Sequence, residues 1–425
     1  EDKGFRGIGR LCGLAYCKEL VFESKAKGES TISIMRCNAK EMRDLITEHN
    51  RGHKQEAVSV LKKVFHFERR NDSEIDDHYF QVSLKNINEE NTDLLDAREI
   101  EAYLSFVAPV PYQQSIFPFR KKIRDYAQSK GLKIDEYCVK LDGKQIFKGY
   151  TDRIKDQYDP SEIFDIAFKD LFDKDGNLLA WLWVGISKFK GALPKSTPMR
   201  SIRLRKHNIQ IGNEDTLQRF FLEDRGHSYF VGEIFAVASE LIPNSQRDYF
   251  NENPTRQEFQ NALEEYFRDE LQRVYKNASI VNSGIKKITN YEQKKSEFTS
   301  KEKSGKFIND KQKDAELAQL EELREKAEKA QKEIEKIEEK TKEENGFFGQ
   351  VIDKIKKDHS IKPSSPPISR PIRKRRTDKL GKFTSKEKKI IERIFEIIHS
   401  AIDNTEMADK LIDEIVKGLA KGLKK

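Results

Sequence analysis

The segments IFDIAFKDLF (residues 163–172) and LLAWLWVGIS (residues 178–187) are apolar and rich in aromatic side chains, and DKDGN (residues 173–177) joins them. Two such segments separated by a short link of Asp, Gly and Asn predict a β-hairpin with a tight turn. The link also has some features of a calcium-binding loop. However, Leu171 and Leu182 occupy the positions of the first ligand and of the bidentate glutamate, so a plain turn is the better prediction.

The hairpin belongs to a predicted unit that spans residues 112–280. After it we expect strands at 201–211 and 229–238, on either side of a helical segment at 215–223. A long helix over 257–277 begins just after Pro254, and proline is common at helix starts. This order of elements predicts a compact α/β unit rather than a repeat array.

The predicted N-terminal domain, residues 1–111, also has a mixed pattern of apolar and polar residues. The stretch 50–77 is polar apart from one apolar patch at 58–67. A helix over 97–106 ends before Pro109 and Pro111. Short apolar or alternating segments predict strands at 20–23, 30–35 and 80–84. The fold class that we expect for both units is α/β, built as two-layer α+β sandwiches.

The composition changes at Ile285, where a charged tail begins. Its first part, 285–345, carries a heptad-like apolar series that predicts either a short coiled coil or a single solvated helix. The series is Leu320, Leu323, Ala327, Ala330, Ile334 and Ile337. Residues 359–383 hold four prolines beside a run of arginine and lysine, which predicts a disordered basic linker. Two amphipathic helices, predicted to form a hairpin, occupy 384–425.

The charge is unevenly distributed. The chain has a net charge of +8, of which residues 285–425 contribute +9 and residues 1–284 contribute −1. The four cysteines show no C-x-x-C spacing, which argues against a disulfide scaffold or a Cys-rich zinc site and favours a reducing compartment. No run of 18 apolar residues predicts a membrane span, and the histidines are isolated. We therefore expect a cytoplasmic protein without a membrane partner or a metal-binding motif of its own.

The glycine-rich segment at the start is the first motif that carries chemistry. It reads Gly4-Phe5-Arg6-Gly7-Ile8-Gly9-Arg10. Glycines let backbone N–H groups approach an anion, and a helix that starts at Ile8 would direct its positive end at that anion. A tight structural turn is the alternative interpretation.

The second motif follows the hairpin directly and reads Ser187-Lys188-Phe189-Lys190-Gly191. Side chains at i and i+2 of an extended segment point the same way, so Lys188 and Lys190 would form one cationic prong. An ordinary solvated loop explains the same residues.

The third motif is ELIPNSQRDYF, residues 240–250. It places Asn244, Arg247 and Asp248 between an apolar strand and a helix. An arginine held on a rigid turn can stabilise the charge that develops in phosphoryl transfer. A surface Arg–Asp pair at a helix start is the alternative.

Together these motifs resemble the GHKL ATPases, the superfamily of gyrase, the heat-shock chaperones, the histidine kinases and MutL. The first segment is similar to their phosphate lid, and G-F-R-G-x-G is its most specific part. The third is similar to the L-P-x-N-x-S-R-E segment of the ninety-kilodalton heat-shock chaperones, with Pro243 and Asn244 matching directly. The resemblance covers about residues 1–280 and implies the end of a nucleotide-binding domain, a transducer domain and a helical tail.

The resemblance implies roles for several residues. Residues 4–10 and Asn244 would bind ATP, Arg247 would contact its γ-phosphate, and either Lys188 or Lys190 would reach the same phosphate. A histidine kinase is disfavoured, because a kinase module would not be followed by this transducer-like unit.

The sequence departs from the family in one respect. The glutamate general base, the magnesium-binding asparagine and the adenine-binding D-x-G-x-G segment have no counterpart before Glu1. We therefore expect a piece of a longer ATPase that uses ATP and Mg²⁺. We expect residues 1–100 alone to bind ATP weakly or not at all, and the chain as given not to hydrolyse it.

The leading hypothesis is an ATP-driven switch or clamp, similar to the MORC proteins and working as a homodimer. The alternatives are a chaperone-like ATPase that binds a client protein, and a non-enzymatic scaffold with a nucleic-acid-binding tail. The tail residues that would contact nucleic-acid phosphates are Arg370, Arg373, Lys374, Arg375, Arg376 and Lys379. A targeting signal or a solubilising linker explains the same basic run.

Overall fold

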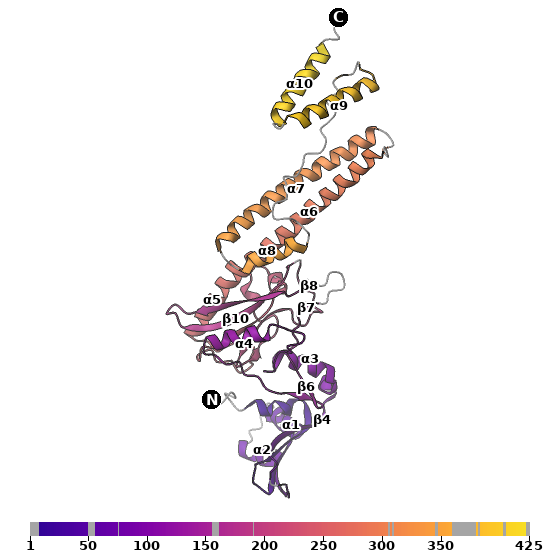
Figure 1. Ribbon diagram of the computed structural model, residues 1–425. Coiled ribbons are helices and arrows are strands. Elements are labelled where there is room, and N and C mark those ends of the chain that lie inside the picture. The colour runs from indigo at the N-terminus through magenta and orange to yellow at the C-terminus, as the bar shows by residue number, and fades with distance from the viewer. Residues whose placement is uncertain are drawn as a thin grey trace. The chain divides into compact units, whose positions relative to one another are not determined.

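The computed structural model (Figure 1) shows a chain of mixed α/β class. It describes residues 8–49, 56–74, 76–154, 161–189, 191–304, 307, 310–344, 347–358, 380, 383–402 and 405–421. The chain forms two compact units. The first unit consists of Glu1–Ser187 and Gly191–Gln272, and the second unit consists of Lys188–Lys190 and Arg273–Lys425. The mixed class agrees with the prediction.

A four-stranded antiparallel sheet with strand order β3-β2-β1-β4 opens the first unit. Apolar side chains on one of its faces, among them Leu20 and Cys37, pack against Leu45 and Val64 of the flanking helices. The elements here are η1 (Ile8–Ala15, a 3₁₀ helix), β1 (Cys17–Lys25), β2 (Thr31–Asn38), α1 (Ala39–His49), α2 (Ala57–Val64), β3 (Phe65–Asn71), β4 (Tyr79–Ile87) and η2 (Glu89–Leu95). The three strands predicted in this region are confirmed, whereas α2 and β3 arise in the stretch for which we predicted no element.

The cysteines of this unit differ in their exposure. Cys17 and Cys37 are buried in the sheet's core, whereas Cys12 and Cys138 are exposed. Burial raises the pKa of the Cys37 thiol to about 11.

The second part of the first unit contains a five-stranded mixed sheet with strand order β12-β11-β13-β10-β9. Strands β11 and β13 are parallel, and the other neighbours are antiparallel. Its elements up to the sheet are α3 (Ala97–Val107), α4 (Arg120–Ser129), β5 (Lys140–Leu141), β6 (Lys144–Gln145), β7 (Arg153–Ile154) and β8 (Ser161–Glu162). The sheet and its connections are β9 (Asp165–Phe172), β10 (Leu178–Ile186), β11 (Ser201–Lys206), β12 (Ile209–Ile211), η3 (Gln218–Phe220), η4 (Asp224–Tyr229) and β13 (Val231–Ala236).

The predicted hairpin is confirmed as β9 and β10, which pair from Asp165 to Ile186. In its turn, the Asp173 carboxylate accepts hydrogen bonds from the backbone N–H groups of Asp175 and Asn177, at 2.9 and 2.7 Å. These bonds are those of a tight turn. Within the described ranges, no group of three or more metal-ligating side chains comes together.

Two other predictions in this part are wrong. Residues 201–211 are not one strand, because His207 and Asn208 have φ angles of 50° and 58° and turn the chain between β11 and β12. The helix predicted at 215–223 is reduced to the three-residue η3.

A charged network is buried inside this part of the unit. Glu233 of β13 and Arg205 of β11 form an ion pair whose side chains are both fully buried. Lys148 donates to the other carboxylate oxygen of Glu233 at 2.7 Å, and the Tyr112 hydroxyl also donates to it. Arg205 further donates to the carbonyl oxygens of Asn208 and Phe106, at 3.0 and 2.8 Å. The network therefore joins the sheet to the C-terminal end of α3.

The helix predicted over 257–277 is longer than expected. It begins at Pro254 as α5 (Pro254–Glu265), continues through the π-helical η5 (Tyr266–Leu271) and runs on as α6 (Gln272–Lys303). The Asn253 side chain caps its start by accepting from Arg256 N at 2.7 Å. Residues 280 and 285, where we placed the end of one domain and the start of the next, lie inside α6.

The second unit is helical, and α6 packs against α7 (Asp310–Glu344) as an antiparallel pair (Figure 1). Tyr291 and Phe298 of α6 share a core with Ala327 and Leu320 of α7. A Cβ atom on Gly284 would lie 2.9 Å from Ile334, which shows how closely the two helices approach. The heptad series therefore belongs to a coiled-coil-like pair within one chain, not to a single solvated helix.

The described residues of the second unit add three further helices: α8 (Phe347–Asp358), α9 (Ser385–Ala401) and α10 (Thr405–Lys421). Thr384 and Glu387 form a capping box at the start of α9. The predicted hairpin of the last two helices is confirmed, with Phe395, Ile412 and Val416 in its core. None of the helices in the described ranges is long and apolar enough to cross a membrane.

Candidate functional site

Arg247 lies in a tight turn that is closed by short-range backbone contacts. Pro243 and Phe250 form an isolated antiparallel bridge, and Asn244 N donates to Tyr249 O at 3.0 Å. Arg247 N donates to Asn244 O at 3.2 Å, and Arg247 has a φ angle of 56°. A positive φ is uncommon for a residue with a side chain and points to a backbone held by its surroundings. The predicted rigid turn is therefore present, as a small hairpin.

A second turn braces the first. Gly212 N donates to Arg247 O at 2.7 Å, and Gly212 has a φ angle of 67°. A Cβ atom on Gly212 would lie 2.0 Å from Thr216 Oγ1 and 2.7 Å from Asp248 O. Only glycine allows the two turns to approach this closely.

Arg247 lines a hollow of about 830 Å³ in the first unit. One wall is apolar and comes from α3, with Tyr103, Phe106 and Val107. The polar residues of the lining are Arg203, Gln210, Asn213, Glu214, Thr216, Gln246, Arg247 and Asp248. The hollow thus combines an apolar helix face with two arginines and two carboxylates, and Arg203 pairs with Glu214 at 3.8 Å, which leaves Arg247 as the cation that could meet an anionic group.

The two arginines of the hollow differ in their environment. Arg203 is buried, lies over the Phe106 ring at 4.3 Å, and donates to Gln210 Oε1 at 3.0 Å and to Pro198 O at 2.6 Å. Arg247 is exposed, and its guanidinium has no hydrogen-bond or ion-pair partner among the residues that the structure describes. The described contacts include no ion pair between Asp248 and Arg247, and the Asp248 carboxylate accepts a hydrogen bond from Asn244 Nδ2 at 2.5 Å instead. The surface Arg–Asp pair that we considered as the alternative is therefore absent from this described turn.

The lysine motif has a different geometry from the one we predicted. Phe189 has a φ angle of 45° and its side chain is buried, so the segment is not extended there. Lys188 is half-buried, and its carbonyl oxygen accepts from Asn282 Nδ2 at 3.0 Å. Lys190 lies outside the described residues. Lys188 belongs to the second unit and Arg247 to the first, so no common site of the two is described.

The glycine-rich motif is described only at its C-terminal end. Gly4, Phe5, Arg6 and Gly7 lie outside the described residues, as do the side chains of Ile8 and Arg10. The described residues open with the 3₁₀ helix η1 at Ile8, so a helix start at this residue stays a prediction, and no atom lies within 4 Å of the Cβ position of Gly9. The chain then enters β1, so the described part has a helix followed by a strand, in the predicted order.

The basic run of the tail also lies outside the described residues. This applies to every member of the predicted nucleic-acid-binding set: Arg370, Arg373, Lys374, Arg375, Arg376 and Lys379.

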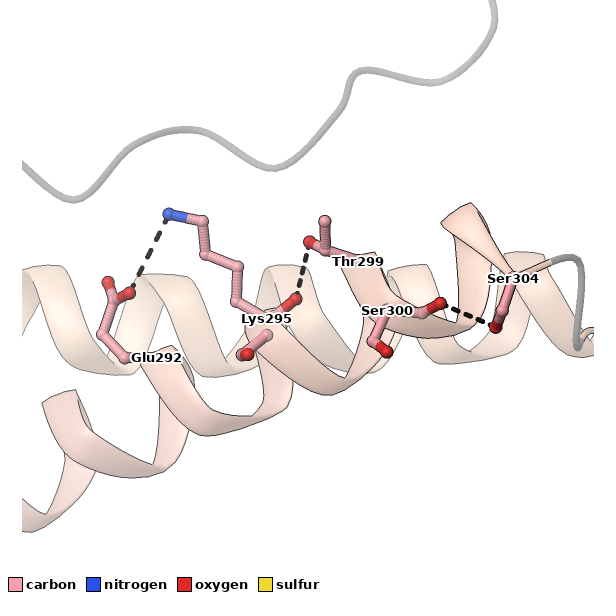
Figure 2. Close-up of a pocket in the computed structure, with 6 residues that line it drawn as sticks. Glu292, Lys295, Thr299, Ser300 and Ser304 are labelled. Atoms are coloured by element: carbon pink, nitrogen blue, oxygen red, sulfur yellow. Dashed lines mark hydrogen bonds and ion pairs between the residues drawn. The ribbon is translucent and has the colours of Figure 1, made fainter.

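A second hollow, of about 680 Å³, lies along one face of α6 (Figure 2). Two of its hydroxyl groups bond to the helix backbone, because Thr299 Oγ1 donates to Lys295 O and Ser304 Oγ donates to Ser300 O, both at 2.8 Å. Glu292 and Lys295 form an ion pair at 3.9 Å. This surface therefore presents no set of polar groups directed at a common ligand.

Replacing Gly212 by alanine tests the brace. We expect Gly212→Ala to lower the free energy of unfolding by roughly 1–3 kcal/mol and to displace the Arg247 turn, because the new methyl group overlaps Thr216 and the backbone at Asp248. Chemical denaturation measures the first effect, and the amide NMR signals of residues 244–249 report the second. Gly176→Ala is the matched control, since Gly176 has a φ angle of 83° but nothing within 4 Å of its Cβ position. Equal effects of the two variants would contradict the brace.

Comparison with protein-family models finds no match for this chain, and comparison with curated proteins finds no significant relative.

Proposed function

We propose that this chain is the phosphate-contacting and transducing part of an ATP-binding and hydrolysing conformational switch of the GHKL class. The observation that carries the proposal is Arg247, an exposed arginine without a described partner, held at a positive φ on a braced turn. A charged side chain held in place without a partner of its own suits an anionic group that arrives from outside the turn.

The walls of the hollow support a coupling role. Helix α3 follows β4 and the 3₁₀ helix η2 along the chain, and its residues line the hollow together with the polar residues of the Arg247 turn. Arg203 and Arg205 of β11 both contact Phe106 of α3. A movement of the N-terminal sheet would therefore reach the hollow through α3, whose C-terminal end is attached to β11.

ATP and Mg²⁺ are the cofactors of the proposed activity. Residues 4–10, Asn244 and Arg247 would lie at the phosphate end of the nucleotide, where the arginine would offset the charge of the transferred phosphoryl group. Asn244 supports the turn here through its bond to Asp248. The metal would shield the phosphate charge, and within the described residues no cluster of carboxylates, histidines or cysteines would hold it.

The proposal has a direct test. It requires an E-x-x-x-N helix and a D-x-G-x-G segment encoded in frame before Glu1, which the genomic sequence shows or does not show. Phosphate release from ATP, measured with Mg²⁺ and with EDTA, then tests the longer protein. Metal-dependent turnover is expected, and its absence in a folded protein that has both segments would contradict the proposal.

The basic run favours a clamp on nucleic acid over a chaperone that binds a client protein. If about five of its residues each neutralise one phosphate, log K against log[salt] has a slope of about −4 to −5 on duplex DNA. Replacing Arg373, Lys374, Arg375 and Arg376 by glutamine should flatten this slope and remove most of the binding. A salt titration of fluorescence anisotropy measures it. Equal slopes for the wild-type chain and the glutamine variant would show that the basic run is only a spacer. The chaperone-like function or the scaffold would then be the favoured hypothesis.

A further inference from the structure

The outer surface of the α9–α10 hairpin carries an apolar strip beside the hairpin's own core. Ile390, Ile394 and Leu411 are exposed by 63%, 46% and 44%. Ile397 and Met407, also exposed, continue the strip at helical spacing. Such residues on a two-helix hairpin, whose core is small, indicate a surface that is covered by something else.

The strip is continuous across the two helices. Ile390 and Ile394 directly precede the core residues Ile391 and Phe395, and Leu411 directly precedes the core residue Ile412. The exposed residues are thus rotated from the core in the same sense on both helices. On each helix, the exposed residue comes one position before a core residue. Because the two helices run antiparallel, this same offset along the chain places the exposed residues of α9 and those of α10 on the same side of the hairpin. The result is one apolar face, which is the form of half a four-helix bundle.

One position of the apolar face on α10 is a glycine. Gly418 directly precedes the core residue Leu419, so it belongs to the same face, and nothing lies within 4 Å of its Cβ position. His399 Nε2 lies 3.3 Å from Asp409 Oδ1, so these two residues are level with each other, and counting nine residues away from them along each helix puts Gly418 at the level of Ile390. Glycine weakens a helix interior, so its place on an open face is explained if a side chain from outside fills the space.

One arginine and one glutamate lie at the two edges of the apolar face, at nearly the same position along the helix axes. Arg393 lies on the outer edge of α9 and Glu414 on the outer edge of α10, and the same alignment puts them within one residue of the same level. Neither has an ion-pair partner in the part of the chain that the structure describes. Both side chains are exposed and remain available to a partner.

From these features we infer that the face binds the same face of a second copy of this chain. A two-fold axis parallel to the helices places α9 of one protomer against α10 of its partner, in antiparallel orientation. Ile390 then lies over Gly418 of the partner subunit, and Arg393 lies opposite Glu414 of the partner subunit. The contacts occur twice and close a four-helix bundle. This inference rests on the hairpin alone and not on the ATPase proposal.

Sedimentation velocity of the full chain without nucleotide, over a concentration series, tests the dimer. We expect Ile394→Glu to raise the dimer Kd by about 100-fold or more, because two buried isoleucines are lost per dimer. Leu222→Glu is the matched control, since Leu222 is 63% exposed in the first unit and should leave the Kd unchanged. A wild-type chain that stays monomeric, or a dimer that Ile394→Glu does not weaken, would overturn the inference.

Two further variants test the proposed geometry. Arg393→Glu should weaken the dimer by a few-fold, and the added change Glu414→Arg should restore it, because the two pairs are rebuilt with exchanged signs. Gly418→Leu should break the dimer while circular dichroism shows equal or higher helix content, since leucine favours helix but fills the space for Ile390. If Gly418→Leu dimerises as well as the wild type, the bundle described here is wrong.

Discussion

Replacing Arg247 by alanine is expected to lower ATP turnover by roughly 10³-fold or more while ATP affinity changes little. The reason is that Arg247 belongs to a separate turn from the glycine-rich segment and would meet the terminal phosphate mainly in the closed state. An interaction made chiefly in the transition state lowers kcat rather than raising KM. Phosphate release and equilibrium nucleotide binding, measured on the protein that includes the nucleotide-binding segment, separate the two effects.

The backbone conformation of Arg247 suggests a second variant, which separates a loss of the side chain from a loss of stability. Arg247 has a φ angle of 56°, which glycine adopts without strain. Arg247→Gly should therefore keep or raise the free energy of unfolding and still lose turnover. Arg98→Ala is the control, because the Arg98 side chain is 91% exposed and pairs only with Asp96 of its own helix cap among the described residues. Unchanged turnover in Arg247→Gly would assign Arg247 a structural role only.

Glu233→Gln should give the largest loss of stability, about 3–5 kcal/mol, because it removes the only carboxylate from a buried network that contains two cations. Burial alone would raise the pKa of Glu233, but Arg205 and then Lys148 outweigh it and lower that pKa to about 2. The carboxylate is therefore charged across the physiological range. Arg205 cannot lose its proton to compensate, so its buried charge would be left without a counter-ion. Thermal and chemical denaturation measure the loss.

Lys148→Met is the matched variant and should have a much smaller effect. Burial and the nearby Arg205 charge lower the pKa of Lys148 from 10.5 to about 7. Between these two values the unfolded chain binds the proton more strongly than the folded chain, so this lysine makes the free energy of unfolding rise with pH across that window. Lys148→Met should abolish that rise and leave the Glu233–Arg205 pair intact. A loss as large as that of Glu233→Gln would show that the lysine charge is needed for folding.

The sequence predicted the elements whose patterns are long and regular. The β9–β10 hairpin, with its Asp-Gly turn, and the amphipathic helices at the C-terminal end are examples. It missed the division of residues 201–211, because His207 and Asn208 read as strand residues until their positive φ angles are known. It also missed the partner of the heptad series, because the apolar side of α6 is spread among polar residues and is recognised only when α7 packs on it.

Less of the candidate site was predictable. Arg247 and Asn244 were predicted from their motif, and the structure places both in one turn. Gly212 and Arg203 were missed, since a single glycine or arginine in a strand region carries no distinctive spacing. The signal that could have indicated Gly212 is its position directly after the β12 segment, where the chain has to reverse. The approach of residues 212 and 247 is a tertiary contact, and no local pattern encodes it.

The exposure of the cysteines determines which of them can be labelled. A maleimide reacts with the thiolate form of cysteine and needs access to the sulfur atom. The dye should therefore modify the exposed Cys12 and Cys138 before the buried Cys17 and Cys37 in the native protein. Cys12 lies in η1, next to the glycine-rich segment, and Cys138 lies beyond α4 in the same unit. In the protein that includes the nucleotide-binding segment, donor and acceptor dyes on these two positions would report whether ATP changes the distance between the 3₁₀ helix η1 and the segment that follows α4.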